Sequence, residues 1–117
     1  MSNQKIADDW KIPAGLSAKA RAAAKAIRKF AFQKGLDDSA GPIFYTPKQW
    51  RERGESYGQS CELIVVYDGA DICTALSFDR AYDFGSYAPL EELAAELRRL
   101  GVFAEEETHW FAGIYAD

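Results

Sequence analysis

Few residues in this sequence have the chemistry of a nucleophile, a general base or a metal ligand. One histidine, His109, and two cysteines, Cys61 and Cys73, are spread along the chain. Nucleophilic catalysis needs a nucleophile held beside a base, and no nucleophile elbow or oxyanion loop accompanies these residues. No Cys-x-x-Cys pair indicates a zinc site. We therefore expect a protein that is not an enzyme, with no catalytic residue, no metal and no cofactor.

Carboxylates are numerous, but their spacing matches no catalytic or calcium-binding pattern. The chain has no recognisable glycosidase pair, no EF-hand spacing and no Gly-rich phosphate loop. Their distribution is more informative. Residues 1–53 carry eleven Lys or Arg and five Asp or Glu, a net charge of +6, whereas residues 54–117 carry three and thirteen, a net charge of −10. The two halves of the chain are therefore oppositely charged.

The acidic half predicts a protein-binding surface. Its carboxylates fall mostly at predicted turns, with aromatic residues among them, and we expect the turns to gather on one rim of a sheet. Carboxylates steer a protein toward a basic groove, and Tyr and Trp are favoured at interface hot spots. Solvation of exposed turns is the simpler interpretation of the same carboxylates. The partner-binding candidates are Asp68, Asp71, Asp79, Asp83, Glu105, Glu106, Glu107, Tyr82 and Trp110, with Tyr57, Phe84 and Tyr87 nearby.

The basic half centres on one predicted helix. It begins after an N-cap at Ser17, runs to about Lys34 and stops at Gly35. Opposite its apolar stripe lies an alternative binding face, which would contact phosphates or an acidic protein patch. The sequence pI of about 5.0 argues against nucleic acid, and a solvated face is again the simpler interpretation. This face consists of Arg21, Lys25, Arg28 and Lys29.

The remaining patterns predict an α+β domain. Apart from a short edge strand near residues 42–45, the expected order is helix, helix, strand, strand, helix, strand, strand. This order indicates an antiparallel sheet of about four strands, made of two hairpins, with the helices packed on one face. A capping box at Thr46 and an Asp-Gly turn at Asp68 are the strongest local signals. The expected elements are helices at 17–34, 47–53 and 89–100 and strands at 61–67, 70–78, 102–106 and 109–115.

Composition and segment patterns set the class of the protein. A hydrophobic content of 48% and a charged content of 27% are typical of a folded domain. We expect one domain over residues 1–117, with residues 1–15 as an arm anchored by Trp10 and Ile12. No apolar run is long enough for a membrane span and no signal peptide is present, so we expect a cytoplasmic location. In the first predicted hairpin the two cysteines are too far apart for a disulfide.

One segment resembles a group of known proteins. Residues 45–55, followed by Tyr57-Gly58 and by residues 65–69, are similar to small uncharacterised accessory proteins of phages and plasmids. In its small size, acidity and lack of enzymatic motifs the chain also resembles anti-CRISPR and anti-restriction proteins. The first resemblance implies no catalytic residues, and the second implies an inhibitor that works by binding.

These observations lead to a functional hypothesis with alternatives. We expect a small non-enzymatic binding protein of a phage or mobile element, which inhibits a host defence complex in the manner of an anti-CRISPR protein. The acidic, aromatic surface would contact the host protein or effector complex. The first alternative is a nucleic-acid-binding or regulatory module that uses the basic helix. A homodimer, in which the basic helix docks on another copy's acidic half, is a further alternative.

Overall fold

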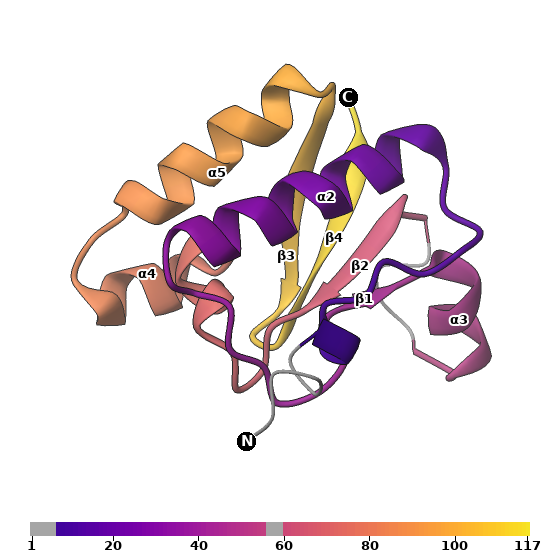
Figure 1. The fold of residues 1–117 in the computed structure, drawn as a ribbon, viewed down its shortest axis with the longest axis horizontal. Coiled ribbons are helices and arrows are strands. Elements are labelled where there is room, and N and C mark those ends of the chain that lie inside the picture. The colour runs from indigo at the N-terminus through magenta and orange to yellow at the C-terminus, as the bar shows by residue number, and fades with distance from the viewer. Residues whose placement is uncertain (1–6, 56–59) are drawn as a thin grey trace.

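The computed structural model describes residues 7–55 and 60–117, and its centre is an antiparallel sheet. The sheet consists of β1 (Phe44–Tyr45), β2 (Leu63–Val66), β3 (Val102–Thr108) and β4 (Phe111–Ala116). Their order across the sheet is β1-β2-β4-β3, so β1 and β3 are the edge strands (Figure 1). The predicted α+β class and the four-stranded antiparallel sheet are confirmed.

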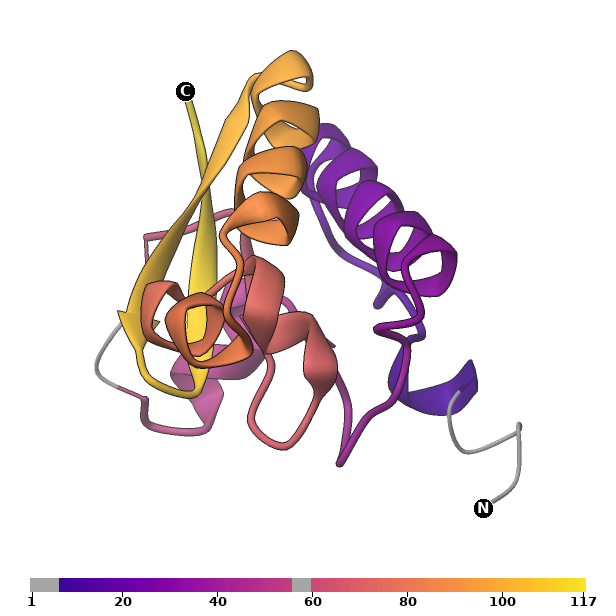
Figure 2. The same ribbon diagram turned by 90° about the vertical axis from the view of Figure 1, so that its left-hand side faces the viewer.

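Two long helices, α2 (Ala18–Gln33) and α5 (Ala88–Arg99), lie side by side over one face of this sheet (Figures 1 and 2). The hydroxyl of Ser17 accepts a hydrogen bond from the backbone amide of Ala20 at 3.1 Å and so begins α2 where the capping signal predicts. The small alanine side chains on the buried side of α2 allow this helix to approach the sheet and α5 closely. The main core between these helices and the sheet includes Ala20, Ala23, Ala24, Ile27, Leu63, Val65, Leu93, Leu97 and Ile114.

The short helix α3 (Pro47–Glu52) packs on the other face of the sheet. Its capping box forms as predicted, because Thr46 and Gln49 each bond the other's backbone amide. Trp50 is fully buried, with its ring centroid 4.8 Å from that of Phe111, and it also packs against Ile64. The expectation that all helices share one face is therefore not met by α3.

The predicted hairpin at Asp68-Gly69 is wrong. Strand β2 pairs with β1 and β4, and the chain after it forms a 3₁₀ helix, η1 (Asp71–Ala75), and then the helix α4 (Phe78–Phe84). The Asp-Gly turn does form, with Gly69 at φ 75° and a hydrogen bond from the Ala70 amide to the Tyr67 carbonyl at 3.0 Å. The turn therefore leads into helix rather than into a second strand, and the predicted element order is wrong at this point.

Helical spacing explains why residues 70–78 do not form a strand. The buried side chains Ile72, Ala75 and Leu76 recur at three- and four-residue spacing, which places them on one face of a helix. Ser77 then caps α4, its hydroxyl accepting from the Arg80 amide at 3.4 Å. Residues 79–84, expected as a loop, are therefore helical.

The second predicted hairpin is present as β3 and β4, and its turn lies at His109–Trp110. The three glutamates that we placed at this turn, Glu105 to Glu107, instead lie within β3, and a register irregularity falls between Glu106 and Thr108. Because side chains alternate along a strand, the three carboxylates cannot face the same way. This alternation divides the expected acidic rim.

The described part of the N-terminal arm is tied to the body of the protein. Trp10 is 1% exposed, and its indole nitrogen donates to the carbonyl of Asp37 at 2.9 Å, while Ile12 packs against the core. Both cysteines are free thiols, with Cys61 in the Trp50 cluster and Cys73 against the main core. Within residues 7–55 and 60–117, no helix has the length and apolar character that crossing a bilayer requires.

Candidate protein-binding surface

Exposed aromatic side chains are concentrated on α4 and just after it. The exposed fraction is 61% for Phe78, 71% for Tyr82, 57% for Phe84 and 37% for Tyr87. The rings of Phe78 and Tyr87 stack with centroids 4.9 Å apart. We call these four residues, together with Asp79 and Asp83, the α4 surface. Large aromatic residues exposed together on a small protein are typical of a site that another protein covers.

The α4 surface is held firmly to the sheet. One carboxylate oxygen of Glu106 accepts from the hydroxyl of Ser77 at 2.8 Å, and the other accepts from the amide of Phe78 at 3.0 Å. At the other end, Gly85 adopts the left-handed conformation, with φ 90°, and ends the helix. The start of this seven-residue helix is therefore bonded to β3 and its end is capped, although the helix is too short to be stable alone.

The carboxylates of Asp79 and Asp83 lie one helical turn apart on α4, and both residues are exposed. Residues three and four positions apart are neighbours on a helix, so the two negative charges stand together beside Tyr82. Of the predicted candidates, Tyr82, Asp79 and Asp83 are thus brought together by one element.

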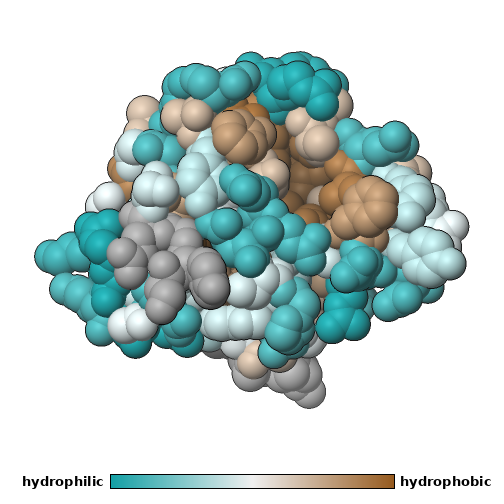
Figure 3. Space-filling model, turned by 180° about the vertical axis from the view of Figure 1, so that it is seen from behind, coloured by the Kyte–Doolittle hydropathy of each residue, from teal (hydrophilic) through white to brown (hydrophobic). Residues whose placement is uncertain are grey.

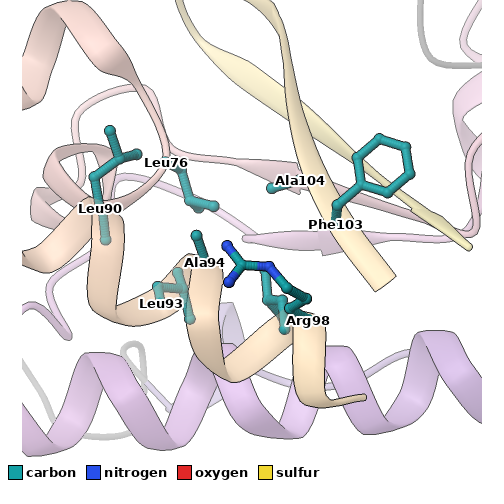
Figure 4. Close-up of a pocket in the computed structure, with 9 residues that line it drawn as sticks. Leu76, Leu90, Leu93, Ala94, Arg98, Phe103 and Ala104 are labelled. Atoms are coloured by element: carbon teal, nitrogen blue, oxygen red, sulfur yellow. The ribbon is translucent and has the colours of Figure 1, made fainter. Parts of the chain in front are cut away.

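An apolar hollow of about 130 Å³ lies between α5 and the edge strand β3. Its walls come from η1, α5 and β3, and Phe103 at its border is 44% exposed. Seen from the side opposite to Figure 1, hydrophobic side chains gather around a hollowed part of the surface (Figure 3). The residues that matter most here are Leu76, Leu90, Leu93, Ala94, Phe103 and Ala104 (Figure 4).

Arg98 is a charged residue at the border of this hollow. It projects from α5, and its guanidinium extends toward the space between α5 and β3 (Figure 4). The apolar walls of the hollow disfavour a charged side chain inside it, and the guanidinium at its rim repels a basic one most strongly. The hollow therefore selects by charge as well as by size.

The other predicted acidic residues lie elsewhere. Asp68 and Asp71 border a separate polar hollow with Cys73, Arg80 and His109. Burial, the largest cause, raises the pKa of the Cys73 thiol, so the thiolate that a nucleophile needs is disfavoured there. Within residues 7–55 and 60–117, no group of three or more His, Cys, Asp or Glu side chains is placed to hold a metal ion.

The three glutamates of β3 have three different surroundings. Glu105 is exposed, Glu106 binds the start of α4, and the carboxylate of Glu107 accepts a hydrogen bond from the Tyr115 hydroxyl. Burial and this hydrogen bond raise the pKa of Tyr115. Trp110 packs against Trp50, with ring centroids 5.6 Å apart. Glu106, Glu107 and Trp110 thus make structural contacts, which leaves Glu105 as the exposed acidic residue of β3.

The basic residues of α2 are also divided. Arg21 and Arg28 are half-buried, and a guanidinium nitrogen of Arg28 donates to the Trp10 carbonyl at 3.5 Å. Lys25 and Lys29 are exposed, and Lys29 lies on the side of α2 that meets α5, beside Glu96. The predicted basic face therefore has two exposed lysines and one arginine that bonds the N-terminal arm.

No family of known proteins, no curated protein and no solved structure matches this chain. We therefore infer function from the geometry of the chain itself. The segments in which we noted a resemblance to phage and plasmid accessory proteins include α3 and the end of β2, and Tyr57-Gly58 falls outside the described residues.

The sequence patterns missed Phe78, Phe103 and the hollow beside β3. A signal for Phe78 was present, because a serine cap at Ser77 predicts a helix in which Phe78 and Tyr82 share one side. No local signal exists for the hollow, since it forms only where η1, α5 and β3 meet. Tyr57 lies outside the residues that the structure describes.

Proposed function

We propose that this chain is a protein-binding protein that contacts its partner through the α4 surface. The observation that carries the proposal is the exposure of four aromatic side chains, between 37% and 71%, on and just after one firmly held helix. Burying apolar surface yields roughly 25 cal/mol per Å², so covering several such rings is enough to drive association. Because Glu106 already fixes α4, little ordering is needed on binding.

The charges beside these rings point to a basic partner. Asp79, Asp83 and Glu105 are exposed carboxylates, and the half of the chain that contains them has a net charge of −10. Such a surface attracts a basic groove of the kind that binds nucleic acid. The narrower form of the proposal is therefore an inhibitor, in the manner of anti-CRISPR proteins of phages and mobile elements, that occupies such a groove on a host complex.

Quantitative affinity purification from host cells tests the broader proposal. We expect the double variant Tyr82→Ala and Phe84→Ala to lose the proteins that the wild-type chain retains. Phe32→Ala, which removes a 48% exposed ring from α2, is the matched control and should retain them. Equal recovery by all three chains would contradict a binding role for the α4 surface.

Charge reversal tests the narrower form. Changing Asp79, Asp83 and Glu105 to Lys leaves the contacts of Glu106 and Glu107 intact. We expect inhibition of a nucleic-acid-binding effector complex by the wild-type chain, weakened at high salt and lost in this variant. Inhibition that survives the triple reversal at low salt would show that attraction to a basic groove is not its cause.

Nucleic-acid binding by α2 is the second candidate function, and the exposure of Lys25 and Lys29 supports it. It predicts DNA or RNA binding whose affinity falls steeply with salt. Lys25→Ala with Lys29→Ala should reduce that salt dependence, with Lys48→Ala as an exposed control. Absence of binding at low ionic strength would exclude this function.

A further inference from the structure

The edge strand β3 presents backbone hydrogen-bonding groups to the outside of the sheet. The amide of Asp117 donates to the carbonyl of Gly101 at 2.9 Å, and the register continues with Phe103 opposite Tyr115. Ladder bonds alternate along an antiparallel pair, so Phe103 and Glu105 bond to β4, whereas Ala104 turns its peptide groups away from β4. Its position as an edge strand makes β3 a template for one more strand.

The hollow between α5 and β3 lies beside this outward-facing peptide. Ala104 is itself one of its lining residues, so the side chain of Ala104 points toward α5. In a strand added to β3, the residue opposite Ala104 would project to the same side and enter the hollow. The volume of about 130 Å³ is close to that of a cavity that holds benzene, which suits one leucine-sized side chain.

The neighbours of Ala104 define the other contacts. Phe103 and Glu105 project from the opposite face of β3, and both are exposed. A residue opposite Glu105 is favoured if it is basic, and a residue opposite Phe103 is favoured if it is apolar or aromatic. The residue in the hollow is favoured if it is apolar, because the walls of the hollow are apolar, and a basic residue there is repelled by Arg98.

We propose that β3 binds an extended segment of a partner protein as an added antiparallel strand. From its N-terminal side, the segment has Lys or Arg opposite Glu105. A leucine-sized apolar residue then lies opposite Ala104, and an apolar or aromatic residue lies opposite Phe103. The proposal rests on the protein-binding function above and names how the partner is held. Backbone bonds supply affinity, and the alternating side chains supply specificity.

A second copy of this chain fits the site less well. Pairing of two β3 strands about Ala104 would place only a methyl group opposite the hollow. It would also set Phe103 of each copy opposite Glu105 of the other, with no opposite charge for the carboxylate. The occupant is therefore a different chain with a basic residue at that position.

Synthetic peptides test this mode of binding on the full-length chain. The probe is a blocked seven-residue peptide with Lys-Leu-Phe at its centre and Ser and Thr around it. Titration followed by amide NMR should give saturable shifts at Val102, Ala104 and Glu105. Replacing the central Leu by Lys, or the first Lys by Glu, should weaken binding at least tenfold.

Backbone methylation of the peptide tests the strand itself without altering the protein. An N-methyl group on the central Leu blocks a bond to Ala104 and should abolish binding, whereas one on the Phe points away and should be tolerated. In the protein, Ala104→Pro removes the outward-facing amide and should also abolish binding. The variant should still fold, because proline is tolerated on edge strands. The variant Glu105→Lys should reverse the preference from the Lys peptide to the Glu peptide.

Two results would overturn the proposal. One is the absence of saturable shifts along β3 at millimolar concentrations of the Lys-Leu-Phe peptide. The other is equal binding of the two N-methylated peptides. The two proposals fail separately. If Tyr82→Ala with Phe84→Ala releases a partner that Ala104→Pro retains, the α4 surface binds protein but β3 adds no strand, and the strand proposal alone is overturned.

Discussion

The carboxylate of Glu106 on β3 accepts a hydrogen bond from the hydroxyl of Ser77 at 2.8 Å, joining an edge strand to the start of a helix 29 residues earlier. The same carboxylate accepts from the amide of Phe78, the first residue of α4. One side chain thus holds the aromatic residues of α4 in place next to β3. The two parts of the proposed binding surface are coupled through this contact.

Removing this contact should loosen α4. We expect Glu106→Ala to reduce the free energy of unfolding by about 1–3 kcal/mol, because it leaves the helix start without its acceptor. Urea denaturation measures the loss, and hydrogen exchange should speed up within Phe78–Phe84. Glu105→Ala, on the same strand but exposed, should change stability by less than about 0.5 kcal/mol. Equal effects of the two changes would contradict the assigned role of Glu106.

Trp50 should be the most costly single truncation on its side of the sheet. It is fully buried and contacts Phe111, Tyr45 and Trp110. We expect Trp50→Ala to cost about 3–5 kcal/mol, enough to unfold a marginally stable domain. Trp50→Phe, which keeps an aromatic ring, should cost clearly less. Thermal unfolding followed by circular dichroism compares the two, and a small effect of Trp50→Ala would show that α3 adds little to the core.

Two glycines distinguish the energetic cost of a side chain on a left-handed backbone from the cost of a steric clash. Gly69 has φ 75°, and a Cβ there would lie 2.9 Å from Cβ of Ala40, whereas Gly85 has φ 90° with open space around it. Gly85→Ala should cost about 1–2 kcal/mol for the left-handed backbone alone. Gly69→Ala should cost more, and Ala40→Gly in the same chain should recover part of the difference. No recovery in that double variant would mean that the steric contact is not the cause.

Stability should fall at high pH because Cys61 is buried. Burial raises the pKa of its thiol from 9.0 to about 11, so the folded protein keeps a proton that the unfolded chain releases. Stability from this group is complete below pH 9 and is lost as the pH rises to about 11, by an amount on the order of 2 kcal/mol. Denaturation at pH 8 and pH 10.5 measures the loss, which Cys61→Ala should reduce. An unchanged pH dependence in that variant would assign the loss to other groups, such as Tyr67.

Local signals predicted several elements correctly. Ser17 begins α2, Thr46 and Pro47 begin α3, and the segment after Gly101 forms the β3–β4 hairpin. These signals act through bonds between residues a few positions apart, so they are present in the sequence itself. The error at Asp68-Gly69 has the same origin, because an Asp-Gly turn specifies a reversal of the chain but not the conformation of the residues after the turn.

The sequence and the tertiary structure each determine part of the surface proposed for binding. Composition and charge order alone indicated an acidic second half with aromatic residues, and they identified Asp79, Tyr82, Asp83 and Glu105. Tertiary packing then divided that set, because alternation along β3 turned Glu106 toward α4 and Glu107 toward Tyr115. The edge position of β3 follows from the order of the strands in the sheet, and the hollow next to it forms only where η1 packs against α5 beside β3. Local patterns carry no information about such contacts, so only the folded structure could reveal this site.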